Sequence, residues 1–333
     1  MKRTAYIISA IIIILFLNSC DDTKKKMALR SSGKTAELIV VTNNQTQWEE
    51  NIGDSIRAFY QQEFNILPQP EPIFNLANVP MATFIDSKMF RTHHNVLIVD
   101  IKKDAIKTEM EARKDYWSSP QRVVKIVAPS RKAFLEFFEE KKEIILGIQM
   151  QSERERMYSL FKAFRDLALR EEIHKAYKLT LEMPEGFYIA KKFSNFVWMR
   201  KETKNNSQGI MIYSYDFTDT SAFDPTRIIS YRDSLTKEFV PGPTEGSYMA
   251  ISKKFIQPQF KEINFLGKYA IETRGLWKVE NDFMGGPFVS YTFVDEKRNR
   301  VITLDGYVYA PNAPKRDLMI QLESIFYSLK LDK

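Results

Sequence analysis

Three short apolar runs in the first half of this 333-residue chain constrain its fold most strongly. They occupy residues 38–41, 96–101 and 123–128, and each is rich in Val, Ile or Leu. Such runs are typical of strands that are buried on both faces of a sheet. Residues 48–60 and 134–145 instead carry apolar side chains at helical spacing. Strands that alternate with amphipathic helices predict an α/β sandwich.

Helix-start signals support this pattern. Thr46 and Ser152 each precede a glutamate by three positions, which forms a capping box, and Ser130 is a suitable N-cap residue. We therefore expect one helix to begin near each of these residues. The α/β half is predicted to cover residues 36–180.

Short β-rich segments and turn signals replace this alternation in the second half. Asp224 followed by Pro225 predicts the N-cap and first turn of a helix, and Pro314 is expected to open a closing helix. Residues 295–300 predict a hairpin turn between two strands. Residues 181–333 therefore predict an α+β half, an antiparallel sheet with helices on one face. The sequence leaves open whether the two halves share one sheet.

The N-terminus resembles the leader of a bacterial lipoprotein. Lys2 and Arg3 give a charged start, residues 6–17 are almost entirely apolar, and Leu-Asn-Ser-Cys ends at Cys20. A membrane-spanning helix needs about 20 apolar residues, so this run fits the core of a signal peptide. The final four residues are similar to the lipobox, which implies a signal peptide over residues 1–19 and an acylated Cys20. An uncleaved membrane anchor and a plain secretory leader remain the alternatives.

Cys20 is the only cysteine in the chain, which fits a thiol used for lipid attachment and not for a disulfide. Residues 20–35 are expected to form a flexible tether between the lipid and the folded part. The expected location is the cell envelope, with the membrane contacted through the acylated cysteine. We place the protein at the outer membrane, on its periplasmic or surface face.

The stretch ALRSSGKT at residues 28–35 fits a loose phosphate-loop pattern, yet we predict no nucleotide site there. A phosphate loop follows a strand and opens a helix, so that backbone N–H groups face the phosphate. Here Lys34 leads into the apolar run at residues 38–41. The formal charge of +7 is spread along the chain without an arginine-rich block, which does not indicate a nucleic-acid partner.

Three stretches resemble one family: LPQPEPIFNLANVP, FRTHHNVLIVDI and GLWKVENDFMGGPFVSY, at residues 67–80, 90–101 and 275–291. Together with the lipobox they are similar to an uncharacterised domain family of Bacteroidetes lipoproteins. This resemblance implies an envelope protein of unknown function and supplies no catalytic residues. The final strands and closing helix also resemble the α/β/α sandwich of PsbP/Mog1-like proteins, a non-enzymatic fold.

The histidines His93, His94 and His174 form no pattern for catalysis or metal binding. On an extended segment, His93 and His94 are expected to point to opposite faces, so one metal ion could not take both. The chain has no H-E-x-x-H spacing and no G-x-S-x-G elbow. We therefore predict no catalytic residue, no metal and no cofactor. A pair of carboxylates brought together by the fold stays open as an alternative.

One stretch near the C-terminal end is the most typical of a binding site. Arg274 and Trp277 lie in a β-rich segment, and Asp282 and the pair Gly285 and Gly286 follow. A large amphipathic ring, an acid and glycines that permit close approach predict a contact with a small ligand or a protein. The alternative is a hairpin loop with a packed tryptophan.

The proline-rich residues 67–80 are expected to form a stiff extended connection, which either packs along the fold or binds a partner. The preferred interpretation of the whole chain is a non-enzymatic envelope lipoprotein that serves as a binding or interaction module, with an envelope protein as a possible partner. The alternatives are a carboxylate-dependent hydrolase that acts on envelope glycan and a carrier of lipids or small molecules.

Overall fold

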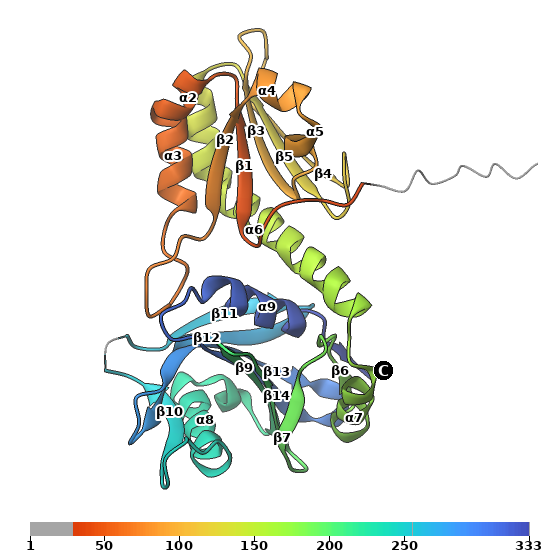
Figure 1. The fold of residues 1–333 in the computed structure, drawn as a ribbon, viewed down its shortest axis with the longest axis vertical. Helices are drawn as coiled ribbons and strands as arrows, with labels where there is room; N and C mark the ends of the chain where they lie inside the picture. Colours follow the sequence, from red (N-terminus) through yellow and green to blue (C-terminus); the bar gives the residue numbers. More distant parts are fainter. Residues whose placement is uncertain (1–28, 255, 333) are drawn as a thin grey trace, which may run out of the picture.

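The computed structural model describes residues 29–254 and 256–332, and these form two main sheets joined by a long helix (Figure 1). The proposed signal peptide, Cys20 and the start of the tether lie outside the described residues, so the lipid anchor stays a prediction. Within the described residues, no helix combines the length and the apolar character needed to span a membrane.

Five strands form the first sheet, in the order β2-β1-β3-β5-β4. The bounds are β1 (Glu37–Thr42), β2 (Asn75–Pro80), β3 (Asn95–Ile101), β4 (Glu109–Lys114) and β5 (Arg122–Ala128). All run parallel except β4, an antiparallel edge strand. The three apolar runs of the sequence are β1, β3 and β5, in the centre of the sheet. The predicted α/β half is confirmed.

Helices cover both faces of this first sheet. On one face α3 (Asn51–Tyr60) and α6 (Arg131–Ala163) bury Phe59 and Phe138 against strand residues such as Val40. On the other face α4 (Met81–Asp86) buries Phe84 against β1 and β3, and the short α5 (Lys88–Arg91) follows it. Each central strand is thus buried on both sides, which explains its nearly continuous apolar sequence.

Two helix boundaries differ from the sequence prediction. The first helical pattern is divided into α2 (Gln45–Glu49) and α3, and the N-cap is Asn44 instead of Thr46, because the Asn44 side chain accepts from the Gln47 N–H. Ser130 caps α6 as expected, but Ser152 lies inside this single helix of 33 residues. No proline interrupts α6, so a capping-type sequence in its interior does not end it.

The second sheet has eight strands in the order β10-β12-β13-β14-β9-β8-β7, with β11 paired to β12. Its pairings are antiparallel. The bounds are β7 (Tyr188–Lys192), β8 (Phe196–Glu202), β9 (Ser207–Asp216), β10 (Tyr248–Ser252), β11 (Gln259–Phe265), β12 (Lys268–Glu280), β13 (Gly285–Asp295) and β14 (Arg300–Tyr309). The turn after β13 is the predicted hairpin, with a 3₁₀ turn at Glu296–Arg298. The two halves do not share a sheet.

Helices lie on both faces of the second sheet as well. α8 (Pro225–Phe239), with Asp224 as the predicted N-cap, packs on one face after a 3₁₀ turn at Thr220–Phe223. α9 (Arg316–Phe326) packs on the other face and contacts α6 (Figure 1). At the side, α7 (Leu167–Tyr177) precedes a small sheet of β6 (Leu179–Thr180) and β15 (Lys330–Leu331). The α+β half is confirmed, but its helices lie on both faces of the sheet and not on one, because α8 and α9 pack on opposite sides.

The proline-rich segment packs along the fold and joins the two halves. Glu71 accepts hydrogen bonds from the backbone N–H groups of Lys315 and Arg316, at 2.6 and 3.1 Å. α9 has no side-chain cap from its own N-cap residue. The Glu71 carboxylate therefore caps α9 from the other half of the chain, where the positive end of the helix dipole favours an anion.

The last part of the expected tether belongs to the fold. Arg30 and Ser32 form isolated β-bridges with Ser119 and His93. The Ser32 carbonyl accepts from the His94 backbone N–H at 3.0 Å and lies 2.8 Å from Nδ1 of the same residue. The prediction of a flexible tether was wrong from Arg30 onward, because the backbone there forms hydrogen bonds and β-bridges with residues next to β3.

His93 and His94 do not point to opposite faces, contrary to the prediction. Their rings stack with centroids 4.6 Å apart. Both residues precede Asn95, where the regular strand β3 begins, so the alternation of side chains along a strand does not apply to them. His94 Nε2 lies 2.6 Å from Glu153 Oε1, and Arg156 donates to Glu153 Oε2 at 2.9 Å. Burial opposes ionisation of Glu153, yet these two partners outweigh it and hold its pKa below the usual range.

Candidate binding groove

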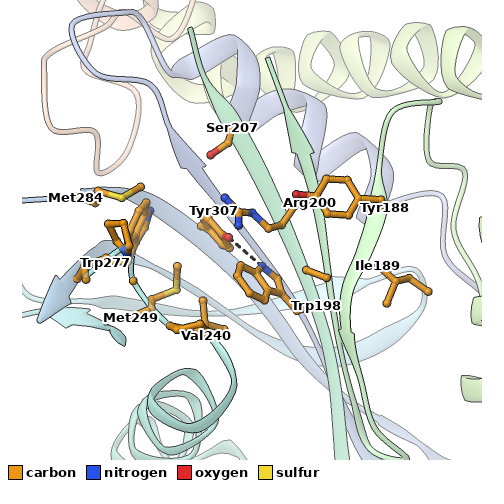
Figure 2. A pocket seen from close by; sticks show the side chains of 15 residues that line it. Tyr188, Ile189, Trp198, Arg200, Ser207, Val240, Met249, Trp277, Met284 and Tyr307 are labelled. Atoms are coloured by element: carbon orange, nitrogen blue, oxygen red, sulfur yellow. Dashed lines mark hydrogen bonds between the residues drawn. The ribbon is translucent and has the colours of Figure 1, made fainter. Parts of the chain in front are cut away.

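A groove of about 520 Å³ crosses the α8 face of the second sheet, next to the loop that follows α8 (Figure 2). This volume falls within the roughly 300–1,000 Å³ that is usual for small-ligand sites. Two tryptophans, two tyrosines and two methionines contribute to its walls. The lining residues are Tyr188, Ile189, Ala190, Trp198, Arg200, Ser207, Val240, Pro241, Gly242, Pro243, Met249, Trp277, Val279, Met284 and Tyr307.

Strand register brings the central residues of the groove together. Trp198 and Arg200 are two positions apart on β8, so both side chains stand on the same face. Arg200 is opposite Gly209 on β9, and Gly209 is opposite Tyr307 on β14. A Cβ atom on Gly209 would lie 2.1 Å from two ring carbons of Tyr307. The glycine therefore lets the Tyr307 ring lie across β9 beside Trp198 and Arg200.

A second glycine positions Trp277. Its indole Nε1–H donates to the carbonyl of Val308 at 3.2 Å, across the intervening strand β13. Gly286 is opposite Trp277 in this register, and a Cβ atom there would lie 2.0 Å from the Val308 oxygen. Trp277 is 2% exposed and packs edge-to-face on Tyr307, with ring centroids 5.2 Å apart. The glycine pair was predicted to permit the close approach of a ligand or partner. Gly286 instead permits the close approach of Trp277 and the Val308 carbonyl within the sheet.

Trp198, Arg200 and Tyr307 contribute polar groups to the centre of the groove. Trp198 Nε1–H donates to the Tyr307 hydroxyl at 2.9 Å, and the Arg200 guanidinium lies 5.0 Å from the centre of the Trp198 ring (Figure 2). Arg200 forms an ion pair through Nη2 with Glu202, the last residue of β8. Its buried Nε has no hydrogen-bond partner among the described residues. Burial raises the pKa of Tyr307 above its usual value, so the hydroxyl keeps its proton.

A buried ion pair holds α8 on the sheet next to this groove. Arg232 of α8 donates through Nε and Nη2 to the two carboxylate oxygens of Asp305 on β14, at 2.7 and 3.2 Å. The Arg232 guanidinium also lies 4.0 Å from the centre of the Phe288 ring. Both charged groups are almost fully buried, at 1% and 0% exposure of their side chains. The bidentate geometry fixes the position of α8, and hence of the loop that edges the groove.

The residues predicted for a binding loop do not form one site. Trp277 lines the groove, Gly286 is its cross-strand partner, and Gly285 pairs with the next residue, Lys278. Asp282 lies in the hairpin turn between β12 and β13, where it accepts from the Thr244 hydroxyl at 2.7 Å. Arg274 faces the opposite side of the sheet, because it is an odd number of positions from Trp277.

Arg274 takes part in the contact between the two halves of the chain. It is bound to Glu272 at 2.8 Å and to Glu323 of α9 at 2.9 Å. Its guanidinium also lies 5.7 Å from the ring centre of Phe64, a residue of the first half. Its role is therefore structural packing around α9.

Sequence reasoning missed Trp198, Arg200 and Tyr307, which form the centre of the groove. A signal for them was present: glycines inside strands often mark a close approach of another group, and Gly209 is such a residue. Which residues lie opposite Gly209 depends on the register of β8, β9 and β14, and the sequence alone does not supply this register.

A second hollow of about 620 Å³ lies on the first sheet, beside α4 and β4. Phe84 and Trp117 pack edge-to-face there, with ring centroids 5.4 Å apart. Its rim carries Glu109, Glu111 and Arg113 on the edge strand. Among the described residues, no group of three or more His, Cys, Asp and Glu side chains is placed to hold a metal ion.

Fold and groove together define a mixed α/β protein with a parallel-sheet part followed by an antiparallel-sheet part. Residues 31–162 match the family model "Domain of unknown function (DUF8532)", and residues 166–328 match "Domain of unknown function (DUF4837)". The two halves of the chain thus each match an uncharacterised domain family. The two matches meet where α6 ends. No curated protein matches the chain.

Solved structures resemble part of the chain only distantly. A point mutant of the protein Mog1 is 10% identical over 47% of this chain and 92% of its own, with a TM-score of 0.31. The Saccharomyces cerevisiae Ran-binding protein Mog1p is 10% identical over 46% and 90%, with a TM-score of 0.30. The human StarD13 (DLC2) lipid transfer and protein localization domain is 11% identical over 47% and 94%, with a TM-score of 0.22. Similarities at these TM-scores carry no inference about function.

Proposed function

We propose that this protein is a non-enzymatic binding module that holds an apolar group in the groove on the α8 face of the second sheet. The observation that carries the proposal is the gathering of Trp198, Trp277, Tyr307 and two methionines around one open hollow of about 520 Å³. Aromatic rings and methionines offer large, adaptable apolar contact surfaces.

The composition of the groove favours binding over hydrolysis. A glycosidase needs two carboxyl groups that flank the scissile bond, and one of them needs a raised pKa. Of the residues that the structure describes, no Asp or Glu lines the groove. In the second hollow, the hydrogen bond from Arg113 lowers the pKa of Glu111, which keeps it ionised and unsuited to protonate a leaving group.

A groove-filling variant tests the proposal. Ala190 lies at a β-bulge of β7 and lines the groove, whereas Ala112 lies on the exposed edge strand β4. In fluorescence titrations with a neutral apolar dye such as Nile red, Ala190→Trp is expected to weaken binding at least about tenfold, because the added ring fills the hollow. The matched control Ala112→Trp is expected to bind like the wild type. Equal binding by all three folded proteins would contradict the proposal.

We further propose that the module is an envelope lipoprotein, anchored at the outer membrane through an acylated Cys20, where an envelope protein is its partner. The short apolar leader and its single cysteine support this anchor. Palmitate labelling of the wild type that is lost in Cys20→Ala is the expected result. An unlabelled wild type that fractionates with soluble proteins would refute the anchor, and crosslinking in native membranes would identify the partner.

The carrier of lipids or small molecules stays as the second candidate because the groove has the size of a small-ligand site. A carrier retains a bound lipid after it is separated from the membrane, whereas an interaction module does not. The purified protein is delipidated, refolded and incubated with envelope lipids, and its bound lipid is then extracted. One bound lipid recovered per protein favours the carrier.

A further inference from the structure

We infer that the ligand of the groove carries a carboxylate on an apolar body, and that Arg200 holds this carboxylate together with Tyr307. The inference rests on the proposed binding function of the groove and adds the chemical class of the ligand. It follows from three observations: the free donors of Arg200 and Tyr307, the absence of acids from the lining, and the aromatic walls.

Arg200 has a free donor that is turned away from bulk water. Its side chain is 30% exposed, and its Nη2 pairs with Glu202, which is itself 47% exposed. Nε, in contrast, is buried and has no hydrogen-bond partner among the described residues. A buried N–H without an acceptor is costly, and this cost is removed when a ligand oxygen binds there. The exposed pair with Glu202 is weak enough to rearrange.

Tyr307 supplies a second donor in the same groove. Its oxygen already accepts the Trp198 indole N–H at 2.9 Å, so its own O–H remains available to donate. Figure 2 shows the Arg200 guanidinium directed toward this hydroxyl. A guanidinium and a phenol O–H that line the same groove call for a group with two acceptor oxygens, and a carboxylate meets this need.

The Trp198 ring orients the guanidinium and begins the apolar part of the site. Arg200 lies 5.0 Å from the ring centre, a distance at which a cation is attracted to an indole face. Beyond the ring, the groove is bounded by Met249, Val279 and Met284. A ligand with its carboxylate at Arg200 therefore extends its apolar body over the tryptophans toward β10 and the loop after β12.

The lining residues favour an anion over a cation. Arg200 is the only charged residue among the described residues that line the groove. A cationic head group would be repelled by this guanidinium. A neutral head group would lack the charge that strengthens a hydrogen bond from a guanidinium. The ligand class is thus an amphiphilic carboxylate of small-molecule size.

Three ten-carbon probes with the same apolar chain test this assignment: decanoate, decanol and decylammonium, each below its micelle-forming concentration. Binding is measured by isothermal titration calorimetry and by tryptophan fluorescence. The wild type is expected to bind decanoate about 10- to 100-fold more tightly than decanol, as a hydrogen bond to a charged group allows. Decylammonium is expected to bind more weakly than either.

Arg200→Met is the decisive variant, because it keeps an apolar stem and removes every guanidinium donor. It is expected to lose the preference for decanoate while it retains the affinity for decanol. Arg113→Met is the matched control: Arg113 lies on a strand, pairs with a glutamate two positions away and sits 4.6 Å from the ring centre of Tyr116, but it lines the second hollow. Circular dichroism confirms that both variants fold.

The outcomes distinguish failure of the Arg200 assignment from failure of the proposed binding function. Decanoate binding that Arg200→Met leaves within about twofold, or that Arg113→Met abolishes, overturns the assignment of Arg200. Wild-type binding of decanol with no preference for decanoate also overturns it, but leaves the apolar groove in place. If the wild type binds none of the three probes, both the ligand class and the proposed function fail. Tyr307→Phe is expected to weaken decanoate binding alone, by a smaller factor than Arg200→Met.

Discussion

Gly209→Ala is expected to destabilise the protein, although replacing a strand glycine by alanine otherwise stabilises by about 0.5–1 kcal/mol. The new Cβ atom would lie 2.1 Å from two ring carbons of Tyr307 and 2.5 Å from its hydroxyl. Overpacking of this kind costs about 1–3 kcal/mol, and the displaced ring would also lose the Trp198 hydrogen bond, which contributes about 1 kcal/mol. The net expected loss is about 2–3 kcal/mol in the free energy of unfolding.

A double-mutant cycle with Tyr307→Ala isolates this clash. The ring that obstructs the new methyl group is then absent, so Gly209→Ala is expected to be neutral or slightly stabilising, and the coupling energy is about 2–4 kcal/mol. Urea denaturation of the four proteins measures it. Gly147→Ala is the control: this exposed glycine of α6 has no atom within 4 Å of a new Cβ, so the change is expected to stabilise by about 0.5–1 kcal/mol. A loss at Gly209 that persists without the Tyr307 ring would refute the reasoning.

Three further perturbations test other parts of the structure. Arg232→Met is expected to cost about 3–5 kcal/mol in urea denaturation because it leaves the Asp305 carboxylate buried and unpaired, and adding Asp305→Leu should recover much of this loss. Glu153 has a lowered pKa in the folded state, so its stabilising contribution is present above its unfolded pKa and is lost as the pH falls through the folded value. Glu153→Gln should therefore reduce the difference between urea midpoints at pH 7 and pH 4, and an unchanged difference would contradict this. Gly286→Ala should displace Trp277 and shift its fluorescence, whereas an unchanged spectrum would show that β13 absorbs the methyl group.

The parts of the fold that the sequence predicted correctly are those with local signals. The strands β1, β3 and β5 were predictable because burial on both faces leaves a continuous apolar run. The starts of α6 and α8 were predictable because Ser130 and Asp224 cap the helix within three residues. Such signals depend only on neighbours along the chain.

The errors arose where distant contacts decide the structure. The tether prediction was wrong beyond Arg30 because residues there bond to the region around His93 and Ser119. The two histidines stack because Ser32 and Glu153 fix the His94 ring from two other segments. A polar stretch without periodicity gives no indication of such partners.

Only the part of the candidate site around Trp277 was predictable from the sequence. Trp277 and Gly286 were recognised as unusual, since a large ring near a glycine pair suggests close packing. Arg274 was grouped with them by proximity in sequence, although alternation along β12 places it on the other face. Trp198 and Tyr307 come from strands separated by more than a hundred residues, and only the order of β8, β9 and β14 in the sheet brings them together.

The position of the ligand site is tested most directly by the four indole N–H signals in a ¹H–¹⁵N spectrum during titration with decanoate. Trp198 and Trp277 line the groove, whereas Trp48 and Trp117 lie in the first half of the chain. Saturable shifts of the Trp198 and Trp277 signals, with the other two unchanged, are the predicted result. Shifts confined to Trp117, or no shift at all, would contradict a binding groove on the α8 face.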